Sequence, residues 1–102
     1  MLIIVVTCFK FKNYIKFPLE IVIEVVSKST ALKDEELKFK IYQKEGVKYY
    51  VLIYPNVRKV RVFKLIDGKY HKVFENDKNN FTFELSTGCN ISLNVEDIWK
   101  VI

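Results

Sequence analysis

Two carboxylates interrupt an apolar run in the first third of the chain. Residues 19–26 read Leu-Glu-Ile-Val-Ile-Glu-Val-Val, a run of strand length that is rich in β-branched residues. Such a run is typical of a strand buried on both faces. Side chains alternate along a strand, so we expect Glu20 and Glu24, four residues apart, on the same face. Burying an unpaired carboxylate costs several kcal/mol, so each acid needs a cation, a partner or water.

A charged segment after this strand predicts a helix. We expect the helix over residues 34–45, because three acids occupy its first turn and Gly46 suits the left-handed position after its end. Its apolar stripe is predicted to consist of Leu37, Ile41 and Tyr42.

A second strand of the buried type is predicted over residues 47–54, which read Val-Lys-Tyr-Tyr-Val-Leu-Ile-Tyr. Strand, helix and strand in this order favour a parallel βαβ unit with a right-handed crossover. Asp67-Gly68 is a strong hairpin signal between two further strands. The remaining expected elements are strands at residues 2–6, 57–65, 69–74, 81–85 and 91–93, an irregular basic-aromatic connection at 7–17, turns at 27–30 and 87–88, and a short final helix capped by Asn94.

Composition limits the classes of protein and of site. The chain has 102 residues, half of them hydrophobic, which suits one domain over residues 1–102. A net charge of +5 permits a polyanion partner, and a general role in solubility explains it equally well because the lysines are spread along the chain. Cys8, Cys89 and His71 lack the spacing of zinc ligands, and this cysteine usage suits a reducing cytoplasm. No apolar run approaches the roughly 18 residues of a membrane span.

The remaining chemistry is a carboxylate site with a lysine. Carboxylates on adjacent strands can hold Mg²⁺, which prefers oxygen ligands. Such an ion polarises a phosphoryl oxygen and helps to generate hydroxide, while a lysine offsets the negative charge of the transition state. The alternative is a structural ion pair between a strand glutamate and a helix lysine.

A specific motif cluster runs from Pro18 to Pro55. It reads Ile-Glu-Val-Val-Ser-Lys-Ser-Thr at residues 23–30, and it continues with Asp34, Lys38, Tyr42, Gly46-Val47 and Lys48-Tyr49-Tyr50. Near the chain end follow Gly88-Cys89-Asn90 and Val95-Glu96-Asp97-Ile98-Trp99. This cluster resembles the Uma-two family of putative restriction endonucleases, a branch of the PD-(D/E)XK nuclease fold. The family pattern runs E-V-L-S-P-S-T, then D-x-x-x-K-x-x-x-Y-x-x-x-G-V, then an E-Y-W or K-Y-Y strand, and the chain follows it without a gap.

The resemblance implies an α/β fold of the restriction-endonuclease type: a mixed β-sheet with a βαβ core, a C-terminal β-hairpin region and a short terminal helix. It also implies Mg²⁺ as cofactor and DNA as partner. Glu24 matches the second acid of the family's site, and Lys38 is the expected replacement for the lysine that an E-x-K motif would place at Val26. Asp34 and Tyr42 either orient Lys38 or form an ordinary helix ion pair and a core-edge contact.

Two family aspartates lack a counterpart in the expected places. Leu2 to Val6 resembles the strand that carries the family's P-D motif, entered just after that motif, and Tyr54 stands at the aspartate of the family's V-D-P. Glu20 is the candidate substitute ligand beside Glu24, although it lies near a family position that is not the main metal-binding aspartate. We therefore expect a shortened or altered member of the family, or a chain whose start was assigned too late.

These features predict a Mg²⁺-dependent DNA endonuclease, impaired by the missing aspartate. Glu24 and Glu20 are the expected metal ligands, and Lys38 is the expected cation at the phosphate. The alternatives are a catalytically inactive nucleic-acid-binding module and a protein-interaction module on the same fold, the latter pairing its first strand with a second copy as a homodimer. We expect a cytoplasmic protein with no membrane segment.

Overall fold

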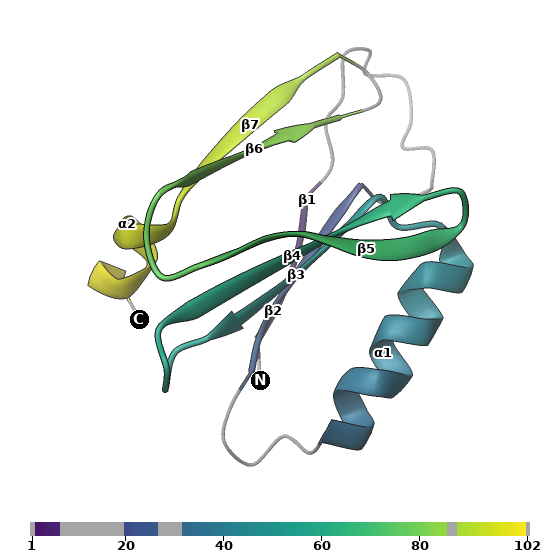
Figure 1. Ribbon diagram of the computed structural model, residues 1–102, viewed down its shortest axis with the longest axis horizontal. Helices are drawn as coiled ribbons and strands as arrows, with labels where there is room; N and C mark the ends of the chain where they lie inside the picture. The colour runs from purple at the N-terminus through teal and green to yellow at the C-terminus, as the bar shows by residue number, and fades with distance from the viewer. Residues whose placement is uncertain (1, 7–19, 27–31, 86–87, 102) are drawn as a thin grey trace.

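The computed structural model of the chain describes residues 2–6, 20–26, 32–85 and 88–101. The strands are β1 (Leu2–Val6), β2 (Ile21–Val25), β3 (Tyr49–Tyr54), β4 (Lys59–Ile66), β5 (Lys69–Asn76), β6 (Asn80–Glu84) and β7 (Asn90–Asn94), and the helices are α1 (Leu32–Glu45) and α2 (Val95–Val101). β1 to β5 form one sheet in sequence order, and β6 and β7 form a second, two-stranded sheet. α1 lies on one side of the five-stranded sheet, and β6, β7 and α2 lie on the other (Figure 1).

The predicted α/β architecture is confirmed. β2 and β3 are parallel and α1 connects them, while the other neighbouring strands are antiparallel. Asp67 and Gly68 join β4 to β5 with φ values of 52° and 79°, as their hairpin signal predicts. Several boundaries differ from the prediction by one or two residues; α1, for example, begins at Leu32 and β3 begins at Tyr49. The connection predicted at 7–17, the turn at 27–30 and Thr87 of the turn predicted at 87–88 lie outside the described residues, and Gly88 of that turn has a φ of 86°.

Each face of the five-stranded sheet packs against its own hydrophobic cluster. Ile21 and Val22 are adjacent in β2 and lie in different clusters, because side chains alternate along a strand. The buried members of the hairpin-side cluster, which includes residues of β6 and α2, are Ile21, Tyr49, Val51, Ile53, Val60, Val62, Phe83, Leu85 and Val95. Those of the helix-side cluster, against which α1 packs, are Val22, Val26, Val47, Tyr50, Leu52 and Tyr70. β2 and β3 are therefore buried on both faces, as their continuous apolar runs predict.

The apolar stripe predicted for α1 is wrong in two of its three residues. Leu37 and Ile41 are 59% and 45% exposed, and the helix packs instead through Phe39 and Tyr42. The sheet presents aromatic rings to the helix, so the helix turns its own rings toward them. Phe39 lies 5.2 Å from Phe63 and from Tyr70, and Tyr42 lies 5.1 Å from Tyr50, all measured between ring centroids.

Polar contacts hold the ends of both helices. Gly46 follows α1 with a φ of 81°, as predicted for the position after the helix. The backbone N–H of Tyr70 donates to Gln43 Oε1 at 2.8 Å, and the Tyr70 hydroxyl donates to the carbonyl of Val47 at 2.7 Å. Burial raises the pKa of Tyr70, so this hydroxyl stays protonated and keeps its donor role. Asn94 caps α2 as predicted, since its Oδ1 accepts from the N–H of Glu96 at 3.1 Å.

Two further observations concern the helices and the described cysteine. Neither of the described helices has the length and apolar character that a membrane crossing needs. Cys89 packs against the hairpin-side cluster and is disulfide-bonded. Disulfides persist mainly in oxidising compartments, so this bond does not support the cytoplasmic location expected from cysteine usage. That location stays a prediction.

The packing of α1 predicts that Phe39→Ala destabilises the fold while Leu37→Ala does not. Phe39 is partly buried, so we expect a loss of about 2 kcal/mol, below the roughly 3–5 kcal/mol typical of a fully buried phenylalanine. Leu37 is largely exposed, and its truncation should change stability by less than about 0.5 kcal/mol. Urea unfolding followed by circular dichroism measures both, and equal losses would contradict the observed helix orientation.

Candidate functional site

Glu24 and Lys38 form the centre of the candidate site. The Glu24 side chain projects from β2 on the α1 side of the sheet and has no exposed surface. Lys38, on the inner face of α1, places its Nζ 3.1 Å from Glu24 Oε2 and keeps 20% of its side chain exposed. The structure therefore supplies the buried acid with the helix cation that the sequence analysis assigned to it.

The strand register extends this site across the sheet. Glu24 pairs with Leu52 of β3, Leu52 pairs with Arg61 of β4, and Arg61 pairs with Glu75 of β5. Directly paired residues point to the same face, so this row lies on the α1 side. Glu24 is the fourth of five residues in β2, and its row crosses the sheet near the carboxyl ends of the two parallel strands. Open α/β sheets bind their ligands outside this end of the strands.

A cavity opens beside this row, between α1 and the sheet. Its volume is about 200 Å³. Leu52, the direct neighbour of Glu24, forms part of its wall. The full lining is Glu36, Phe39, Lys40, Leu52, Tyr54, Arg61 and Phe63. The cavity therefore combines an apolar floor with two cations and one carboxylate.

Glu20 lies just before β2 and is 6% exposed. Its carbonyl accepts from the N–H of Tyr49 at 2.9 Å, which fixes its backbone at the start of the parallel pair. Four residues of strand span about 13 Å, whereas Mg²⁺ holds its ligands at about 2.1 Å. Glu20 and Glu24 could therefore share an ion only if both side chains turned along the strand toward each other.

The two supporting residues differ in what the structure shows. Tyr42 is half-buried beside Tyr50, on the same inner face of α1 as Lys38, which fits a core-edge tyrosine. Asp34 lies in the first turn of α1, and its side chain is outside the part of the chain that the structure describes. Its role in orienting Lys38 stays a prediction.

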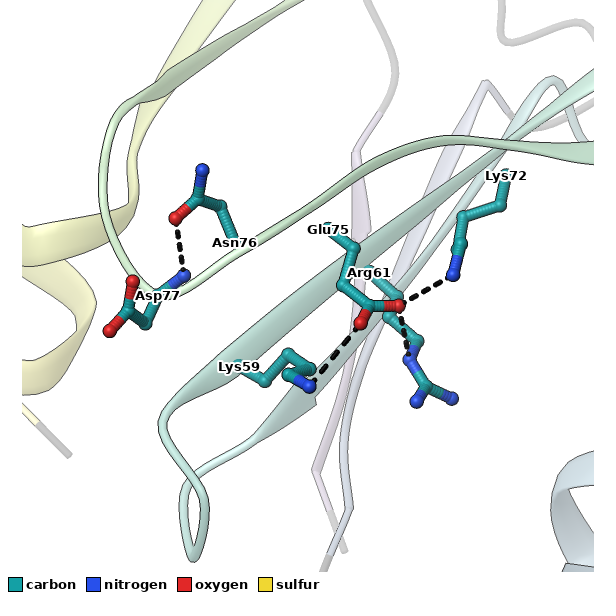
Figure 2. Close-up of polar contacts among 6 residues, drawn as sticks. All are labelled: Lys59, Arg61, Lys72, Glu75, Asn76 and Asp77. Carbon is teal, nitrogen blue, oxygen red and sulfur yellow. Dashed lines mark hydrogen bonds and ion pairs between the residues drawn. The ribbon is translucent and has the colours of Figure 1, made fainter.

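A second charged cluster, which the sequence analysis missed, surrounds Glu75 on β5. Lys59, Arg61 and Lys72 approach its carboxylate with N–O distances of 3.3, 2.9 and 2.7 Å (Figure 2). The hydrogen bond from Lys72, followed by that from Lys59, lowers the pKa of Glu75 to about 2. The Arg61 guanidinium also lies over the ring of Tyr54, 5.1 Å from its centroid. We call Lys59, Arg61, Lys72 and Glu75 the Glu75 cluster.

Part of the Glu75 cluster was visible in the sequence. Alternation along β4 places Lys59 and Arg61 on one face. Lys72 and Glu75 are three residues apart on β5, so a regular strand would put them on opposite faces. The register shift between Val62 and Phe63 brings them to the same face. The residue pattern of β4 and β5 did not predict this bulge.

The donor chemistry at Glu24 fits a hard divalent cation. Within the described ranges, no three His, Cys, Asp or Glu residues come together as a ready metal site. Mg²⁺, however, commonly binds through one or two carboxylates together with water and substrate phosphate. Glu24 is therefore the residue of the described site that could hold it.

The chain matches the model of a known protein family. The model of a protein family described as Uma2, putative restriction endonuclease, matches residues 10–96. The matched range includes Glu24, Lys38 and the Glu75 cluster. No curated protein matches the chain.

The geometry of the ion pair predicts an asymmetric response to mutation. Lys38→Met leaves a buried carboxylate without this cation, and we expect a loss of about 2–3 kcal/mol at neutral pH, at or just below the range for a fully buried pair because Lys38 is partly exposed. Glu24→Gln removes the buried charge itself and should cost less, about 1 kcal/mol. Lys44→Met, an exposed lysine of the same helix outside the cavity wall, is the matched control. Urea unfolding measures all three, and a larger loss for Glu24→Gln than for Lys38→Met would contradict this account.

Proposed function

Because the chain belongs to the Uma2 family of putative restriction endonucleases, we propose that it is a divalent-metal-dependent endonuclease that hydrolyses phosphodiester bonds in DNA. The observation that carries the proposal is the 3.1 Å contact between the buried Glu24 and Lys38, near the carboxyl ends of β2 and β3. A carboxylate that can hold a metal ion and an amine that can offset charge on the phosphate are two groups that metal-assisted phosphodiester hydrolysis uses.

Glu24 would hold Mg²⁺ through its carboxylate oxygens. When bound, the ion would supply Lewis-acid polarisation of the phosphoryl group and a lowered pKa for the attacking water. The protein positions the carboxylate, because β2 is hydrogen-bonded on both sides and the neighbouring β3 is buried from Tyr49 to Ile53. Glu20, about 13 Å away along the strand, is a second candidate ligand and is tested below.

Lys38 would contact a non-bridging oxygen of the scissile phosphate and offset the charge that develops there. Its side chain is the accessible part of the pair, with 20% exposed against none for Glu24. The helix that carries it is anchored next to it, because Phe39 packs between Phe63 and Tyr70. This packing fixes the helix backbone at Lys38, from which the side chain reaches Glu24.

Access to Glu24 requires a rearrangement. The carboxylate is fully buried and already contacts the Lys38 ammonium. A cation and a phosphate reach it when the lysine side chain shifts toward the phosphate, which exchanges one anion partner for another. DNA as the partner and a cytoplasmic location belong to this proposal.

The second candidate function is a non-catalytic DNA-binding module, and the complete burial of Glu24 favours it. In this alternative the Glu24–Lys38 pair is structural, and the basic surface alone binds the polyanion. A protein-interaction role is the third, with β1 at the end of the sheet order available to pair with a second copy as a homodimer. Light scattering of the purified chain tests the homodimer.

Cleavage of supercoiled plasmid tests the proposal. We expect nicking that requires Mg²⁺, stops with EDTA and falls at least about 100-fold in Glu24→Gln and in Lys38→Gln, the size of loss that follows from removing a group that stabilises developing charge. Glu20→Gln should reduce the rate less than Glu24→Gln, because it lies farther from Lys38.

Glu96→Gln, an exposed acid on α2, is the matched control and should leave the rate unchanged. Cleavage that survives Glu24→Gln would overturn the proposed mechanism. Binding of DNA in EDTA without cleavage under any metal would instead establish the non-catalytic module.

A further inference from the structure

The Glu75 cluster contains more cations than are needed to neutralise its one carboxylate. Three cations surround one carboxylate, which leaves a surplus of two positive charges. The cations are also the exposed part of the cluster: Lys59, Arg61 and Lys72 are 40%, 39% and 50% exposed, against 26% for Glu75. An anion from outside can therefore reach the cations without unfolding the strands.

The cluster lies in the same row as the proposed active site. Leu52 separates Glu24 from Arg61 in the strand register, so two strand spacings of about 4.8 Å place their backbones about 10 Å apart. The cavity of about 200 Å³ lies on this row, with Leu52 and Arg61 both in its wall. The other charged residues of that wall, Lys40 and Glu36, contribute no net charge, so the net positive charge of the wall is that of Arg61.

Two contacts hold Arg61 in position before any ligand binds. Its Nε lies 2.9 Å from Glu75 Oε1, and its guanidinium stacks over Tyr54 at 5.1 Å. A planar guanidinium fixed in this way presents its remaining N–H groups as a fork that matches phosphate oxygens. Glu75 stays ionised at every ordinary pH, because the surrounding cations hold its pKa near 2. It therefore acts as an internal counter-anion that keeps three mutually repelling cations together.

We propose that Lys59, Arg61 and Lys72 form a phosphate subsite that binds the DNA backbone beside the scissile phosphodiester held at Glu24 and Lys38. The inference rests on the proposed function, and it assigns the path of the substrate across β3 and β4. A phosphate at this subsite shares the cations with Glu75 and takes up the surplus charge.

The spacing suits a nucleic-acid strand. Phosphates of a duplex strand rise by about 3.4 Å per nucleotide along the axis and also turn about it, so at most a few nucleotides span the gap of about 10 Å between the two positions. Leu52, which lies between them in the strand register, has no charged or polar side-chain group that would bind or repel a phosphate. One backbone could therefore contact Lys38 at one end and Arg61 at the other.

Fluorescence anisotropy with a short labelled duplex tests the subsite in EDTA, where cleavage does not contribute. Each phosphate contact contributes about 0.9 to the slope of log affinity against log salt concentration. We expect Arg61→Gln and Lys72→Gln each to weaken binding several-fold and to reduce that slope by about one unit. Lys69→Gln, an exposed lysine in the same hairpin but at its far end, is the matched control and should leave both unchanged.

Glu75→Gln gives an effect of the opposite sign. Removing the internal counter-anion should strengthen DNA binding several-fold and steepen the salt dependence, since all three cations then depend on the phosphate for neutralisation. A purely structural ion cluster would show no such gain. Thermal unfolding of each variant confirms that the fold is intact, and Lys72→Gln, which leaves two cations on Glu75, provides a second, milder change.

Different experimental outcomes would overturn the phosphate subsite and the proposed catalysis. Arg61→Gln should raise the DNA concentration needed for half-maximal cleavage several-fold while leaving the single-turnover rate at saturating DNA within about twofold of wild type, as expected for loss of ground-state binding alone. Equal DNA affinity and salt slope in wild type, Arg61→Gln and Lys72→Gln would overturn the subsite, as would absence of binding at low salt. Charge-dependent binding without cleavage would retain the subsite and overturn the catalysis.

Discussion

The burial of the Glu24 charge is the constraint on which the rest of the site depends. A carboxylate in the interior of a sheet is tolerated only if the fold delivers an opposite charge to it. The Lys38 ammonium, 3.1 Å away, is that charge, and it comes from the helix of the βαβ crossover. The position of α1 over β2 is therefore tied to the same contact that forms the candidate site.

Aromatic packing sets how α1 is rotated, and this rotation carries the amine to the acid. Phe39 and Tyr42 face the rings of the helix-side cluster, and Lys38, next to Phe39, consequently points toward β2. Had the helix packed through Leu37 and Ile41, Lys38 would have turned away from Glu24. A hydrophobic preference thus fixes an electrostatic geometry, which explains why a helix with so polar a composition docks in one orientation.

The two charged groups on this face of the sheet differ in physical character. The Glu24–Lys38 pair combines one cation with one carboxylate, and the carboxylate is fully buried. The Glu75 cluster carries a net positive charge, because three solvent-exposed cations surround one carboxylate. One row of paired residues joins them through Leu52. Under the proposed function, a phosphodiester backbone that crosses this face would meet the candidate catalytic pair and then the cations of the Glu75 cluster.

The sequence alone determined the order of the elements, the parallel βαβ unit and the hairpin at Asp67-Gly68, because alternation and turn residues are local properties of the chain. The pairing of Glu24 with Lys38 was expected from the family resemblance and its motif spacing. The packing face of α1 was mispredicted because it depends on the aromatic rings of distant strands. The hydrophobic periodicity of the helix carries no information about those rings. The Glu75 cluster was missed because a bulge in the β4–β5 ladder sets which residues face each other. Only the tertiary structure decided these points, since strand register and helix rotation result from contacts between residues far apart in the sequence.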